Sequence, residues 1–107
     1  MILFRAVSAE EYKDFIIDLN FRTAENTLEA KQFFKSEKAV LEFVKIAHKR
    51  SYRPPYKHIL TIDVDSQRLA AIDFESQNLD GYDAITIQEG DLPYFNKCLT
   101  FTSERNV

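Results

Sequence analysis

The sequence predicts an α+β fold: a mainly antiparallel sheet of about five strands, with two amphipathic helices near the N-terminal half packed on it. Two observations support this fold class. Apolar residues recur at helical spacing in two segments before residue 50. After residue 57 the chain turns to short β-branched runs separated by turn signals. The 107 residues suit one domain, so we expect residues 1–107 to form a single domain.

The first strand and the first helix follow directly from the N-terminal residues. Residues 2–7, ILFRAV, are apolar on both faces except at Arg5, which predicts a strand. Ser8 and Glu11 then have the spacing of a capping box. One apolar stripe predicts a helix over residues 9–19, and its members are Tyr12, Phe15, Ile16 and Leu19.

The next segment leaves two alternatives and then gives a second helix. Residues 21–35 fit either a helix or a loop that leads to a short strand at Lys31–Phe34. Ser36 is a suitable N-cap for a helix over residues 37–49. The apolar stripe of this helix comprises Val40, Phe43, Val44 and Ala47.

The C-terminal half is predicted to be sheet. The apolar and β-branched runs predict strands at residues 58–64, 69–74, 84–88 and 97–102. Asp80-Gly81 is typical of a hairpin turn and falls in a long loop, residues 76–83, whose order the sequence leaves open. Leu92-Pro93 marks a turn or the start of a short helix.

Composition excludes several classes of site. The two glycines, Gly81 and Gly90, cannot build a glycine-rich phosphate loop. His48, His58 and Cys98 match no zinc-ligand spacing, so we expect no metal site. No apolar run approaches the ~20 residues that span a bilayer, and no signal peptide is recognisable. We therefore expect a soluble, cytoplasmic protein that makes no contact with membranes.

Positive charge is concentrated in residues 45–58. This stretch carries five basic side chains and no acidic one, whereas the rest of the chain carries 9 basic and 17 acidic side chains. An evenly basic surface would indicate DNA binding, and this distribution gives no strong case for it. A local contact with phosphate or RNA through residues 48–58 is the alternative.

Two alternatives explain the basic stretch HKRSYRPPYKH, residues 48–58. The functional one is an RNA-binding or metal-independent ribonuclease site, in which arginines bond phosphate and tyrosines stack on bases. Its candidate ligand-binding residues are Arg50, Tyr52, Arg53, Tyr56 and Lys57. In the structural alternative, the cations complement the negative C-terminal end of the second helix, and Pro54-Pro55 begin a solvated connector.

Arg5 is unusual because it lies in an otherwise apolar strand. A buried charge without a partner is costly, so this side chain must reach an edge, a cleft or an ion-pair partner. One alternative is an outward-facing Arg5 in a salt bridge. The other is an anion-binding site, for which the planar donor fork of arginine is well suited.

Four segments resemble small ADP-ribosyltransferase-like domains of bacterial polymorphic toxins. They are FRAVSAEEYKDFI (4–16), AKQFFKSEKAVLEF (30–43), HILTIDVD (58–65) and AITIQEGDLPYFN (84–96), about half of the chain. The resemblance implies NAD as cofactor, contacted by Arg5. It also implies that Glu89 is the carboxylate that polarises the ribose and stabilises an oxocarbenium-like state.

The chain departs from that family pattern, and the departures bear on function. Ala30 stands where a glycine often precedes the lysine, and no Glu-x-Glu pair is present. Whether the chain is an enzyme stays open. Because no specific catalytic motif is present, the first hypothesis is a non-catalytic protein-interaction or regulatory module. This module would bind another protein and would use no cofactor. The alternatives are a minimal or degenerate NAD-binding transferase-like domain and an RNA-binding domain.

Overall fold

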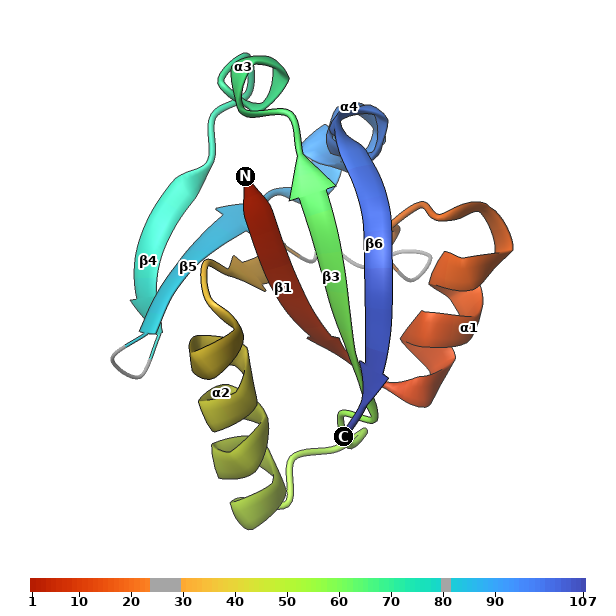
Figure 1. Cartoon of the computed structure of the whole chain (residues 1–107), viewed down its shortest axis with the longest axis vertical. Helices are drawn as coiled ribbons and strands as arrows, with labels where there is room; N and C mark the ends of the chain where they lie inside the picture. Colours follow the sequence, from red (N-terminus) through yellow and green to blue (C-terminus); the bar gives the residue numbers. More distant parts are fainter. Residues whose placement is uncertain (24–29, 80–81) are drawn as a thin grey trace.

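The computed structural model describes residues 1–23, 30–79 and 82–107. Its described strands form one six-stranded antiparallel sheet in the order β4-β5-β2-β1-β3-β6 (Figure 1). The predicted fold class is therefore confirmed. The strands are β1 (Ile2–Val7), β2 (Lys31–Phe34), β3 (His58–Val64), β4 (Glu75–Leu79), β5 (Tyr82–Ile87) and β6 (Leu99–Asn106). The helices are α1 (Ala9–Asp18), α2 (Glu37–Lys49), α3 (Ser66–Leu69), α4 (Leu92–Cys98) and the 3-10 turn η1 (Glu89–Asp91).

Both predicted N-terminal helices form, and each begins at its predicted serine cap. The Ser8 hydroxyl accepts from the Glu11 N–H at 3.2 Å, and the Ser36 hydroxyl accepts from the Ala39 N–H at 3.1 Å. Helix α1 stops one residue before the predicted end because Leu19 adopts a left-handed conformation with φ of 60°. This conformation ends helices at their C-cap.

The sheet buries a different cluster on each face, as side-chain alternation along a strand requires. On one face, Leu3 and Val7 of β1 pack with Phe15 of α1 and Phe95 of α4. On the other face, Ala6 packs with residues of α2 such as Val40. In Figure 1, α1 lies to the right of β6, and α2 lies below β2. Helices therefore cover both faces of the sheet.

One of the two alternatives for residues 21–35 is confirmed. Lys31–Phe34 forms β2, which pairs with β1 on one side and β5 on the other. Phe33 and Phe34 point to opposite faces and belong to different core clusters. Two adjacent phenylalanines thus suit a strand that is covered on both faces. Residues 24–29 and the predicted Asp80-Gly81 turn lie outside the described residues.

Three predictions for the C-terminal half are wrong in part or in whole. The expected strand 69–74 is not a strand: Asp65 caps α3, in which Leu69 is buried. The expected loop 76–83 is mostly strand, because β4 extends to Leu79 and β5 begins at Tyr82. The expected strand 97–102 begins only at Leu99, since α4 includes Cys98.

None of the described helices combines the length and the apolar character needed to cross a lipid bilayer.

Candidate functional site

Arg5 is bound within the chain by a carboxylate of α1. Its Nε and Nη2 atoms donate to the two oxygens of Glu11 at 2.7 and 2.8 Å, and Nη1 donates to the Gln32 carbonyl at 3.0 Å. The guanidinium also lies 5.6 Å from the centre of the Phe33 ring. The predicted salt bridge is therefore present. The predicted outward orientation is wrong, because the side chain is only 15% exposed beneath α1.

Glu11 binds a second cation. Lys31 is 5% exposed, and its Nζ lies 3.5 Å from Glu11 Oε1. Burial opposes ionisation of Glu11 and is the largest single influence on its pKa. The charge and hydrogen bonds of Arg5, followed by those of Lys31, outweigh that burial, and the pKa of Glu11 is lowered. The Arg5–Glu11–Lys31 cluster thus keeps an ionised carboxylate next to two largely buried cations.

Glu89 lies on a different element, at the start of η1. Its Oε1 accepts a hydrogen bond from the Thr23 hydroxyl at 3.3 Å. Thr23 lines a pocket of about 180 Å³ with Glu89, and it also lines a pocket of about 280 Å³ with Glu11. Thr23 therefore borders both Glu89 and Glu11, the carboxylate that binds Arg5. Among the described pockets, none is lined by both Arg5 and Glu89.

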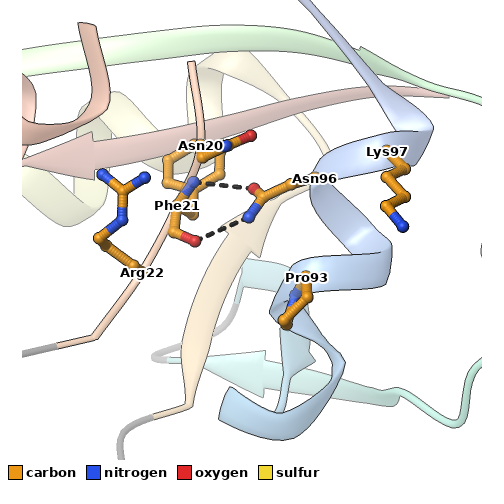
Figure 2. Close-up of a pocket in the computed structure, with 6 residues that line it drawn as sticks. All are labelled: Asn20, Phe21, Arg22, Pro93, Asn96 and Lys97. Carbon is orange, nitrogen blue, oxygen red and sulfur yellow. Dashed lines mark hydrogen bonds between the residues drawn. The ribbon is translucent and has the colours of Figure 1, made fainter. Parts of the chain in front are cut away.

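The largest of the described pockets lies between residues 20–22 and α4. Figure 2 shows Asn96 pointing at the backbone of Phe21: its Oδ1 accepts from the Phe21 N–H, and its Nδ2 donates to the Phe21 carbonyl, both at 2.8 Å. The pocket has a volume of about 360 Å³ and is lined by Asn20, Phe21, Arg22, Pro93, Asn96 and Lys97. Asn96 thus holds residues 20–22, the segment that follows α1, next to α4.

Replacing Asn96 with alanine should loosen this segment. The change removes both bonds to the Phe21 backbone, and we expect a loss of about 1–3 kcal/mol in unfolding free energy. Amide hydrogen exchange should rise first at Phe21. Asn20→Ala, which removes a half-buried amide from the same pocket, is the matched control. Equal exchange at Phe21 in the two variants would contradict a fixing role for Asn96.

No sequence pattern identified Asn96 or Thr23 as site residues. Each makes its contact with a residue far away in the chain, Asn96 with Phe21 and Thr23 with Glu89. A polar residue inside the apolar run LPYFNKC is a weak signal for such a contact. Periodicity alone does not identify the partner.

Comparison with protein-family models finds no match, and comparisons with curated proteins and with solved structures find no significant match. The resemblance to ADP-ribosyltransferase-like domains stays a prediction.

The predicted basic site is only partly available for a ligand. Tyr56 is half-buried, and its ring packs 5.5 Å from that of Phe43. Arg50 donates to the Tyr52 hydroxyl at 3.4 Å. The Tyr52 side chain remains 42% exposed. The remaining candidates, Arg53 and Lys57, are both exposed.

A second pocket of interest, called here the basic pocket, contains these exposed cations. Its volume is about 230 Å³, and it is lined by His48, Ser51, Tyr52, Arg53, Pro55 and Lys57. It involves the C-terminal end of α2 and the connector to β3. None of the residues that line the Glu11 and Glu89 pockets also lines it. The site residues predicted from the sequence therefore divide between two separate places.

The C-terminal turn of α1 and its C-cap residue carry a group of exposed apolar side chains. Ile17 is 78% exposed, and Ile16 and Leu19 are 43% and 38% exposed. Two members of the predicted apolar stripe, Ile16 and Leu19, are therefore not covered. Phe15 and Tyr12 take the inward positions, against Phe101 and His58. We call Ile16, Ile17 and Leu19 the α1 patch.

Within the described part of the chain, no three side chains of His, Cys, Asp or Glu are arranged to hold a metal ion.

Proposed function

We propose that this protein is a non-catalytic module that binds another protein through the α1 patch. The exposure of Ile17 carries the proposal. Large apolar side chains exposed in one helical turn form the kind of surface that protein partners cover. Among the described residues, the large apolar side chains with substantial exposure are few, and Ile16, Ile17 and Leu19 fall within four consecutive positions.

The charge around the α1 patch indicates the chemistry of the partner. Helix α1 carries Glu10, Asp14 and Asp18 on its surface, with Lys13 as its single cation. Arg22 pairs with Asp14 at 3.1 Å and Asp18 at 2.5 Å, and so neutralises part of this charge. A partner surface with an apolar centre and a basic rim would complement what remains.

The state of the candidate catalytic residues supports a binding role over catalysis. The Arg5 guanidinium is fully engaged by Glu11 on one side, and Glu89 already accepts a bond from Thr23. A substrate anion would have to displace Glu11 from a largely buried ion pair. Breaking such a pair is costly.

Site-specific photo-crosslinking tests the proposal. A photoreactive side chain at position 17 is expected to capture a partner in cells, which is then identified, purified and titrated against the chain. Ile17→Asp should weaken that binding by at least tenfold, because a charge would enter the centre of an apolar interface. Val107→Asp, which changes an exposed apolar residue elsewhere, is the control. A captured protein that binds both variants equally would refute a docking role for α1.

A second candidate function is supported by the position of Thr23. Thr23 lines one pocket with Glu11 and another with Glu89. The pocket next to the Arg5–Glu11–Lys31 cluster and the pocket next to Glu89 are therefore neighbours. This arrangement favours the degenerate transferase-like alternative, in which NAD binds along residues 21–23. In this alternative, Glu89 approaches the ribose and Arg5 reaches a phosphate only after release from Glu11.

Titration with NAD separates the two candidates. If NAD binds here, millimolar NAD should shift the amide resonances of Thr23 and Glu89, and Glu89→Gln should weaken the shifts. Asp91→Gln, on the same turn, is the control. Unchanged spectra at millimolar NAD would eliminate the transferase-like alternative and leave the protein-binding proposal intact.

A further inference from the structure

Arg53 differs from the other arginines of the chain. Within the described residues, its side chain makes no hydrogen bond or ion pair. The other arginines all bond to groups of the protein, namely Arg5 to Glu11, Arg22 to Asp18, Arg50 to Tyr52, Arg68 to the Lys97 carbonyl and Arg105 to Glu37. A guanidinium that lines a pocket and has its donors unoccupied is ready to bind an external anion.

The connector that carries Arg53 is held in place at both ends. At the helix end, the Tyr52 N–H donates to the Ala47 carbonyl at 3.0 Å. At the strand end, the Lys57 N–H donates to the Val7 carbonyl at 2.9 Å, and the Lys57 carbonyl accepts from the Val107 N–H at 3.0 Å. His48 Nε2 is 2.9 Å from the Tyr56 carbonyl and joins the two ends. The prolines between them restrict the backbone further, so ligand binding orders little new structure.

The end of α2 does not oppose an anion strongly here. The last carbonyls of a helix carry partial negative charge, which disfavours anions. In this chain the Ile46, Ala47 and His48 carbonyls accept bonds from N–H groups of residues 50–52. No acidic side chain lines the basic pocket, whereas Arg53 and Lys57 both do. The local field therefore favours a negative ligand.

We infer that the basic pocket binds the phosphate group of a small phosphate ester, with Arg53 and Lys57 as its ligands. The volume of about 230 Å³ admits one phosphate with part of its ester. Tyr52 lines the same pocket and is 42% exposed, so its ring can pack against a base or sugar. A mononucleotide has both features. The acidic remainder of the chain disfavours a long polyanion.

This site stands apart from the α1 patch, so the inference does not depend on the protein-binding proposal. Titration of the full chain with inorganic phosphate, AMP and adenosine, followed by NMR, tests it. Phosphate and AMP should shift resonances of residues 48–57, with AMP the tighter ligand and adenosine alone without effect. Arg53→Gln should weaken AMP binding by about tenfold, because charge-assisted bonds are lost.

Lys38→Gln is the matched control, since it removes the same charge from an exposed position at the other end of α2. It should change AMP affinity less than twofold. Equal effects of Arg53→Gln and Lys38→Gln, or shifts that map outside residues 48–57, would overturn the inference. A single-stranded oligoribonucleotide that binds far more tightly than AMP, with a steep dependence on salt, would overturn the small-ligand class in favour of RNA.

Discussion

Replacing Phe33 with alanine is expected to destabilise the protein by about 3–5 kcal/mol, as for other large aromatic residues in a core. The Phe33 side chain is fully buried in β2. Its ring packs 5.2 Å from that of Phe21 and 4.9 Å from that of Phe95, and it contacts Arg5 through a cation–π interaction. The substitution leaves a cavity where these elements meet. Urea denaturation monitored by circular dichroism measures the loss.

Phe74→Ala is the control for this prediction. Phe74 is only partly buried at the margin of the same cluster, so its loss should cost markedly less. Equal midpoints for the two variants would contradict the central position of Phe33. If the unfolding free energy falls with urea concentration at the same slope in both variants, they differ in stability and not in the surface exposed on unfolding.

Glu11→Gln is expected to cost about 2–3 kcal/mol. The change keeps the shape of the side chain but removes the charge that Arg5 and Lys31 share. Removing one partner of a buried ion pair costs about 3–5 kcal/mol, and the partial exposure of Glu11, 22%, lowers that value here. Glu10→Gln, one position earlier and exposed, should change the unfolding free energy by less than about 0.5 kcal/mol.

The same cluster predicts a dependence on pH. The folded-state pKa of Glu11 is lowered, so its ionisation stabilises the protein fully above its usual value of 4.5. This contribution is lost as the pH falls through the lowered folded-state pKa. The difference in unfolding free energy between the parent chain and Glu11→Gln should therefore shrink as the pH falls below 4.5. A difference that stays constant down to pH 2 would contradict the role of the charge.

Local signals predicted the N-terminal half of the fold well. Caps at Ser8 and Ser36 and apolar stripes at helical spacing specify α1 and α2 because they depend on residues three or four positions apart. The same spacing could not show how much of each stripe is covered. Ile16 and Leu19 continue the α1 stripe but stay exposed, since only Phe15 and Tyr12 reach the sheet.

The wrong predictions concern segments whose local structure is determined by contacts with residues distant in the sequence. The run Leu69–Phe74 has the composition of a strand, but Asp65 caps a helical turn that buries Leu69 under the sheet. The basic stretch 48–58 likewise grouped Tyr56 with Arg53 as ligand-binding candidates, although Tyr56 packs on Phe43 and Arg53 is exposed. Residues that look alike in the sequence can therefore differ in burial and in the distant residues that they contact.

The strand order has a consequence for how fast the chain folds. Most neighbours in the sheet are distant in sequence: Ile2 pairs with Asp63 and Lys31 pairs with Ile87, and only the β4–β5 contact is a short hairpin. The entropy of closing large loops must be overcome before such pairs form. High contact order slows folding, so refolding should take milliseconds to seconds, with the β4–β5 hairpin able to form early and the β1–β3 contact forming late.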